Sequence, residues 1–239
     1  MSDLTVPLAA VLTVLWGGLA SADAAAFLQL LLGQPLVAGA VTGALWGRPE
    51  IGLELGSILQ LFACGTLPLG GRTPEDFPAG TVAGVGVACA LARALPLASA
   101  HGGPLLYGLG VAFAVALVGR PLTVELRRKN ESLARWCEDE LVRGRLSALS
   151  AAQWAGVART FALGAALVGV SLGLAALAGR ALLAGQAVVF GRAWQVGSPW
   201  FWGFGAGIVT RGFVRGRRPG VFFWLALVAF LALRLVSVR

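Results

Sequence analysis

Charged residues are scarce in this chain. Of its 239 residues, 13% are charged and 57% are hydrophobic, whereas about a quarter of the residues in soluble domains are charged. The mean hydropathy is +0.80. This composition excludes an ordinary soluble domain and predicts an integral membrane protein.

Histidine and cysteine are also few. His101 is the single histidine, and Cys64, Cys89 and Cys137 lie far apart with no CxxC pair. These residues cannot supply a histidine-rich metal site or a histidine-paired nucleophile, and the cysteines are expected to fill space. We therefore expect no cofactor and no catalysis by this chain alone. The net charge is +8, but its arginines lie beside apolar segments, so we expect no nucleic-acid partner.

Long apolar runs predict an all-α, polytopic membrane fold. A full crossing needs about 20 residues, so the shorter runs are expected to enter the bilayer and turn back as interrupted or re-entrant helical hairpins. The first run is expected to be retained, because the residues before it include Asp3 and no basic residue. The runs cover residues 5–21, 35–47, 51–70, 79–99, 103–119, 161–184, 199–210 and 220–238.

The whole chain, 1–239, is expected to form a single membrane domain. A packed helical half (1–120) is followed by a polar central segment (121–158) and by C-terminal membrane helices (159–239). The central segment mixes charges of both signs with scattered leucine and tryptophan, a pattern typical of amphipathic helices that lie against lipid headgroups. A docking site for a soluble partner is the alternative interpretation.

Basic residues cluster in segments 125–145 and 211–218. Cytoplasmic loops are enriched in lysine and arginine, so both segments are predicted to face the cytoplasm. This orientation requires an even number of crossings between them. The runs at 161–184 and 199–210 supply two, provided that the second extends back through Trp194.

Glycines at every fourth position predict close helix packing in the first third of the chain. Such spacing lets two helix backbones approach each other in lipid. With 34 glycines in the chain, the pattern indicates packing or oligomerisation and says nothing of a substrate. The glycines concerned are Gly39, Gly43, Gly47, Gly52, Gly56, Gly80 and Gly84.

Two polar residues lie within the apolar sequence "IGLELGSILQLF". Polar groups at membrane depth usually face a cavity, a partner or a transport path. For Glu54, a place on such a path and a structural role are equal alternatives. In the structural role it would pair with an arginine such as Arg48 or lie at the membrane interface. Gln60 favours a functional role, because a neutral amide can hydrogen-bond sugar hydroxyls without leaving a charge unpaired.

The stretch "PLGGRTPEDFPAG", residues 68–80, combines helix-breaking proline and glycine with Thr73, Glu75 and Asp76. Irregular backbone at membrane depth is tolerated where it is buried in protein or lines a water-filled cavity. The stretch is therefore a candidate site for a polar substrate. From the residues alone, an ordinary loop in which Asp76 or Thr73 caps a helix is an equal alternative.

Residues 33–80 resemble the signature region of the IIC component of sugar phosphotransferase systems of the mannose/fructose/sorbose family. That pattern runs R-P-L, then GxxxGD, a G-x-x-L-E-L segment and P-x-G-x-x-x-P-P-D. Three positions depart from it: Gln34 replaces arginine, Arg48 replaces aspartate and Gln60 replaces glutamate. The matching residues are Pro35, Leu36, Gly43, Gly47, Gly52, Gly56, Gly65, Pro68, Gly70, Pro74 and Asp76.

The resemblance implies a sugar-translocating subunit of the bacterial cytoplasmic membrane. It implies a hetero-oligomer with a IID membrane subunit, and soluble IIA and IIB components that relay phosphate to a hexose-type sugar at the cytoplasmic face. The IIC component itself carries no phosphorylated residue, so this chain is not expected to be an enzyme. The expected sugar-binding residues are Asp76, Gln60, Glu54, Glu75 and Thr73.

The departures leave a second hypothesis open. Loss of a glutamate at a sugar-facing position, together with an expected missing final membrane element, would suit a divergent subunit that assembles with IID but does not transport. Such a subunit would have a structural or regulatory role.

Overall fold

The computed structural model describes residues 5–27, 29–66, 74–95, 102–213 and 219–237, all as helices and their connections. Within these ranges no strand occurs, in agreement with the all-α prediction. Four of the helices, α1, α4, α5 and α6, are long and apolar enough to cross a membrane. The helices are α1 (Thr5–Ala25), α2 (Pro35–Leu45), α3 (Pro49–Ala63), α4 (Phe77–Ala94), α5 (Gly102–Val142), α6 (Ser147–Phe213) and α7 (Pro219–Ser237).

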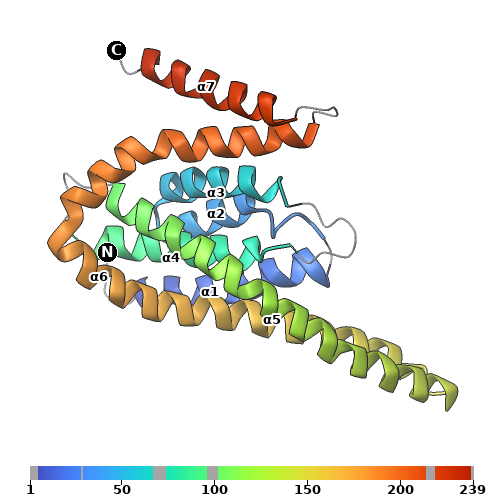
Figure 1. The fold of residues 1–239 in the computed structure, drawn as a ribbon. Coiled ribbons are helices and arrows are strands. Elements are labelled where there is room, and N and C mark those ends of the chain that lie inside the picture. Colours follow the sequence, from blue (N-terminus) through green and yellow to red (C-terminus); the bar gives the residue numbers. More distant parts are fainter. Residues whose placement is uncertain (1–4, 28, 67–73, 96–101, 214–218, 238–239) are drawn as a thin grey trace.

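Helices α2 and α3 form a short hairpin inside the bundle (Figure 1). Both begin with proline in the first turn, where the missing N–H has no intrahelical acceptor to lose. Gly47 closes the turn between them with φ +67°, a conformation that favours glycine. The hairpin is too short to cross a bilayer twice, as expected of a re-entrant element.

Glycines hold the hairpin together at backbone contact distance. A Cβ atom added at Gly39 would lie 2.6 Å from the carbonyl oxygen of Gly52 and 2.9 Å from the Cα of Gly56. The same holds at Gly80, where an added Cβ would lie 2.5 Å from the carbonyl oxygen of Ala112 on α5. The predicted packing role of these glycines is therefore confirmed, whereas Gly47 serves the turn and meets no atom within 4 Å.

Helix α4 lies at the centre of the molecule. It contacts every other helix except α7, and most of its side chains are buried. Its small residues allow this contact on all sides. The core therefore forms where α1, α2, α3, α5 and the first part of α6 surround α4.

Helices α5 and α6 extend beyond the bundle as a two-helix projection (Figure 1), here called the arm and defined as residues 121–142 of α5 and 147–158 of α6. The central polar segment is therefore not a separate set of helices. Pairs such as Glu131 with Arg135, 3.8 Å apart, stabilise a helix outside the core and let each membrane helix continue into the polar segment.

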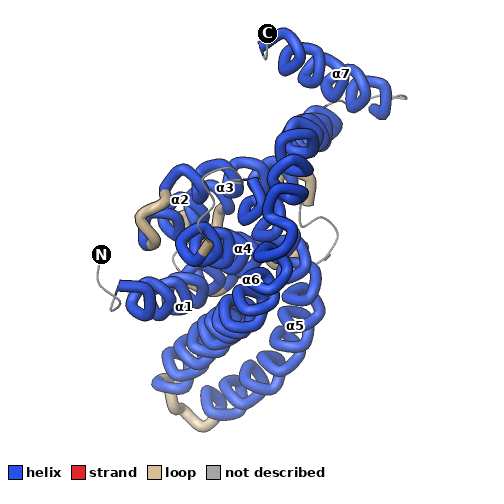
Figure 2. Tube along the Cα trace, turned by 90° about the vertical axis from the view of Figure 1, so that its left-hand side faces the viewer, coloured by secondary structure: helices blue, strands red, loops and turns tan. Residues whose placement is uncertain are grey.

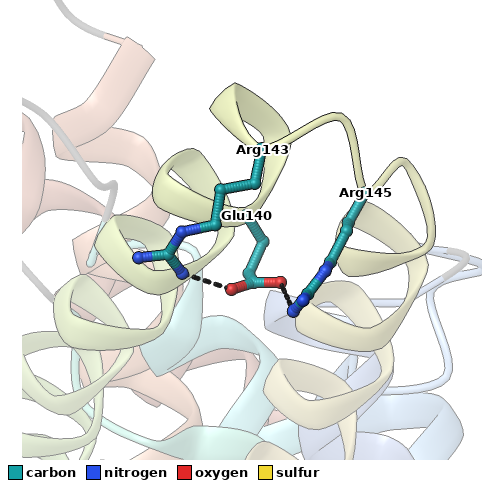
Figure 3. A network of polar contacts seen from close by, with 3 residues as sticks. All are labelled: Glu140, Arg143 and Arg145. Carbon is teal, nitrogen blue, oxygen red and sulfur yellow. Dashed lines mark hydrogen bonds and ion pairs between the residues drawn. The ribbon is translucent and has the colours of Figure 1, made fainter.

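The tip of the arm is fixed by Glu140 (Figure 3). Its two carboxylate oxygens accept hydrogen bonds from Arg143 at 2.5 Å and from Arg145 at 2.6 Å. Hydrogen bonds from Arg145 and then from Arg143 lower the pKa of Glu140 below its ordinary value. The turn that follows contains Gly144 with φ +81°, so the arm ends in a compact reversal.

Helix α6 folds back on itself after the arm. The backbone leaves the helical region at Gln186, with φ −133° and ψ 19°, and the second limb returns over α3 (Figures 1 and 2). There Gly65 contacts Ile208, so Arg211 lies at the end of the bundle where α3 ends. The two expected crossings between the basic segments are thus two limbs of one kinked helix. Arg211, at the start of the second basic segment, lies at the same end of the bundle as the arm, whereas residues 214–218 of that segment fall outside the described residues.

Among the described helices, α7 packs only against the second limb of α6 and stands away from the rest of the bundle (Figure 2). Side chains of α7 occupy the space beside glycines of that limb: Phe223 contacts Gly207, and Leu227 contacts Gly203. Other apolar side chains of α7, such as Trp224 and Leu225, are exposed. The C-terminal part of the molecule is thus less buried than the core.

Candidate functional site

Polar side chains gather at the end of the bundle from which the arm projects. The C-terminus of α1, the start of α2, the end of α3 and the start of α4 all meet there. The described part of the connection between α1 and α2, residues 26–27 and 29–34, runs across this end. We call it the α1–α2 loop.

Asp23 shapes this loop from the last turn of α1. Its side chain is buried, and its oxygens accept hydrogen bonds from the backbone N–H groups of Leu30 at 2.7 Å, Leu32 at 2.8 Å and Gly33 at 3.4 Å. A carboxylate that accepts several backbone N–H groups satisfies donors that have no helical partner. Asp23 therefore fixes the path of the loop.

Two residues of the loop adopt left-handed backbone conformations without being glycine. These are Gln29, with φ 55°, and Leu31, with φ 66°. Such conformations are uncommon outside glycine, and they cluster at binding and active sites. Both residues line a hollow of about 430 Å³. The strained part of the loop is thus a wall of a cavity.

This cavity, which we call the loop hollow, is mixed in character. Besides Gln29, its polar groups come from Asp23, Gln34, Thr66 and Glu75. Proline and alanine side chains and Phe77 form much of the remaining wall. An apolar surface with a few amide and carboxylate groups suits a small, uncharged polar ligand.

Gln34 and Gln60 meet at the edge of the loop hollow. The amide nitrogen of Gln60 donates to the side-chain oxygen of Gln34 at 2.9 Å, and the amide oxygen of Gln60 accepts from the backbone N–H of Leu36 at 3.2 Å. Gln34 lines the hollow, whereas Gln60 supports it from α3. Two of the three positions that depart from the signature pattern are therefore direct partners.

Glu75 and Asp76 lie between the core and the root of the arm. A Glu75 oxygen is 3.5 Å from Arg120 of α5. Asp76 caps α4 by accepting from the backbone N–H of Ala79 at 3.2 Å, and Thr123 donates to its other oxygen at 3.5 Å. The capping role that the sequence offered for Asp76 is thus present.

Asp76 is also held from the α5 side. Its backbone N–H donates to the carbonyl oxygen of Ala116 at 3.0 Å, and a Cβ added at Gly119 would lie 2.7 Å from the Asp76 Cβ. A larger residue at position 119 would displace the start of α4. The position of the Glu75 carboxylate consequently depends on the glycine in α5.

A larger hollow of about 710 Å³ lies on the other side of Glu75 and Asp76, at the root of the arm. We call it the arm hollow. Thr123, Arg127 and Asn130 from α5 contribute polar groups to its wall. Glu75 lines both hollows, so the segment before α4 separates them.

The remaining sequence expectations have mixed outcomes. Glu54 lies six residues before Gln60, about 9 Å along the helix axis, and is not among the residues that line either hollow. Arg48 lies 3.7 Å from Glu50 at the opposite end of the hairpin. Thr73 falls outside the described residues. No cluster of histidine, cysteine or carboxylate side chains that could hold a metal was found among the residues that the structure describes.

Asp23 and the α1–α2 loop were missed by the sequence reasoning. The available signal was the position of Asp23 in "SADAAAF", at the end of an apolar helix, since ionisable residues in membrane helices are commonly functional. The left-handed conformations of Gln29 and Leu31 have no comparable signal in the sequence.

Comparison with known proteins places these features in a family. The family model described as the sorbose-specific IIC component of the phosphotransferase system (PTS) matches residues 7–185. The chain belongs to this family. It is therefore a multi-pass membrane protein and a transport component of a PTS, as the resemblance of residues 33–80 indicated.

Solved structures agree with the fold of this IIC chain. One, described only as a membrane protein, has a TM-score of 0.53 at 19% identity over 98% of this chain and 96% of the other. A chain of the mannose transporter ManYZ, solved by cryo-EM with microcin E492, has the same TM-score and identity over 100% and 93%. None of the curated proteins compared with the chain matches it.

Proposed function

We propose that this IIC chain binds a hexose-type sugar in the loop hollow and releases it at the end of the bundle that carries the arm. The observation that carries the proposal is the loop hollow itself: its volume is about 430 Å³, and Gln29, Gln34 and Glu75 line it. Amides and a carboxylate can replace the water that surrounds sugar hydroxyls, each hydrogen bond contributing about 0.5 to 3 kcal/mol.

The neutral Gln34–Gln60 pair supports a working sugar site over the non-transporting alternative. Arginine and glutamate in the family pattern are both replaced here, and the replacements are hydrogen-bonded to each other. Replacing both partners of a contact leaves no charge unpaired, whereas replacing one would strand the other. The departures at Gln34 and Gln60 therefore form a matched exchange that preserves the wall of the hollow.

The remaining assignments follow the family. The chain would reside in the bacterial cytoplasmic membrane. Its arm would lie on the cytoplasmic side, because the arm is rich in arginine and cytoplasmic loops are enriched in basic residues. It would assemble with a IID subunit; the similarity to the mannose transporter ManYZ supports a partner of that kind. Soluble IIA and IIB components would supply phosphate, and the sugar would reach IIB by way of the arm hollow. This chain would bind and pass on the sugar without itself transferring phosphate.

Substitution of Gln34 tests the proposal. The chain, purified with its IID partner, should bind hexose saturably in isothermal titration calorimetry, and Gln34→Leu should weaken binding about tenfold, equivalent to about 1.4 kcal/mol. Gln195→Leu, an exposed glutamine on the second limb of α6, is the matched control and should bind normally. Absence of saturable hexose binding by the unsubstituted complex would support the non-transporting alternative.

A further inference from the structure

An apolar groove lies at the end of the molecule opposite the arm. It is bounded by α1 from Val6 to Leu15, by the last turns of α4 and by α6 from Gly169 to Arg180, and its volume is about 550 Å³. With the exception of Arg180, its lining side chains are apolar or belong to Trp46, whose indole N–H donates to Thr13 at 2.9 Å. We call it the outer groove.

Gly173 makes the groove hollow. A Cβ atom added at Gly173 would meet no atom within 4 Å, unlike one added at Gly39 or Gly52 of the α2–α3 hairpin, which would meet backbone atoms. The absent side chain is thus not replaced by a neighbouring helix. Space remains at Gly173 for a molecule that is not part of this chain.

The dimensions of the outer groove match one leaflet of a bilayer. Gly169 and Arg180 are eleven residues apart, which is about 17 Å along α6, and half of a hydrocarbon core is about 15 Å thick. A pathway for a transported sugar would have to cross both leaflets and carry polar groups along its length. The outer groove does neither.

Arg180 lies at one end of the groove, and none of the described residues pairs with its charge. It is exposed, and it makes no hydrogen bond or ion pair within the part of the chain that the structure describes. A guanidinium group is suited to bind a phosphate through two N–H donors. The groove therefore presents an apolar slot of leaflet depth with a phosphate-binding group at its end.

We propose that the outer groove holds an acyl chain of an anionic phospholipid whose phosphate binds Arg180. An apolar membrane helix is a poorer fit, because it brings no phosphate to the exposed guanidinium of Arg180. The site is separate from the loop hollow and does not depend on sugar binding.

The test is lipid retention by the full chain, purified in mild detergent with any subunit that stays bound. The protein is equilibrated with phosphatidylglycerol or phosphatidylcholine of the same acyl chains, and bound lipid is counted by native mass spectrometry. We expect retained phosphatidylglycerol, about tenfold less of it in Arg180→Gln, and loss of both lipids in Gly173→Leu. Arg192→Gln and Gly110→Leu are the matched controls, since Arg192 is also an exposed arginine of α6 and Gly110 also faces open space.

Thermal unfolding checks that each variant is folded, and Ala176→Phe replaces Gly173→Leu if the latter does not fold. Equal retention of the two lipids by the unsubstituted protein overturns the proposal. Lipid retention that is unchanged in both Arg180→Gln and Gly173→Leu also overturns the proposal. The same holds if the groove retains no lipid because another subunit occupies it.

Discussion

The two ends of the helical bundle treat polar groups differently. At the arm end, the oxygens of Asp23, Gln60 and Asp76 accept hydrogen bonds from nearby backbone, and Glu75 lies beside Arg120. At the opposite end, Arg180 has no partner among the described residues and borders an apolar groove. Partners within the protein hold a site in fixed geometry, whereas a charge at the membrane surface without such a partner interacts with water or lipid headgroups. The first arrangement suits selective binding of a small molecule, and the second suits lipid.

The largest expected effect comes from removing Asp23. Asp23→Ala would leave up to three backbone N–H groups of the α1–α2 loop without their acceptor, at about 1 to 3 kcal/mol for each buried group. We expect a loss of about 3 kcal/mol in the free energy of unfolding and no measurable hexose binding. Thermal unfolding and calorimetry would measure both. Asp139→Ala, on the exposed face of the arm, should change neither, and normal hexose binding by Asp23→Ala would contradict the role given to the loop.

A smaller effect is expected at Asp76, which positions the start of α4. In Asp76→Asn the side chain can still accept from Ala79 but loses the charge that favours both the helix N-terminus and the contact with Thr123. Hexose affinity should fall about tenfold, or about 1.4 kcal/mol. Glu50→Gln, in the first turn of α3 at the opposite end, is the control. Unchanged affinity in Asp76→Asn would remove Asp76 from the site.

These residues show how much the sequence could predict. The cap at Asp76 and the backbone contacts of Gly39 and Gly80 depend on local spacing, which is visible in the sequence. The Gln34–Gln60 contact joins residues 26 positions apart, and it requires the α2–α3 hairpin to close in one register. Local spacing carries no information about that register.

The α1–α2 loop and the kink of α6 were beyond the sequence for another reason. Asp23 is recognisable as a carboxylate in an apolar run, but its three acceptor contacts depend on left-handed conformations at Gln29 and Leu31, which neither residue type favours. At Gln186 the helix breaks directly after Gly185, a residue that makes a helix easier to bend, but one glycine does not mark a kink in a chain with 34 of them. The surrounding packing must determine both features.

The smallest effect is expected at the tip of the arm, remote from both ends of the core. Because its partners lower the pKa of Glu140, its contribution to stability is complete above the ordinary pKa of 4.5 and is lost as the pH falls through the lower pKa of the folded state. Acidification in that range should lower the protection factors of the amides in residues 142–147, that is, their exchange rates corrected for the intrinsic pH dependence of amide exchange. Glu140→Gln should show the faster exchange at neutral pH, with Glu138→Gln as the exposed control. Protection factors that are independent of pH would contradict this role of Glu140.

The central claim is that sugar binds at the arm end, in the loop hollow, and a comparison of cysteine labelling at the two ends tests it most directly. In a Cys64→Ser background, which removes the exposed native thiol, one variant carries Leu31→Cys in the wall of the loop hollow and another carries Val6→Cys in the outer groove. Both positions are exposed. Saturating hexose should slow maleimide labelling at position 31 about fivefold or more while leaving position 6 unchanged. Hexose that binds by calorimetry yet leaves position 31 unprotected, or that protects position 6 instead, would contradict the proposed site.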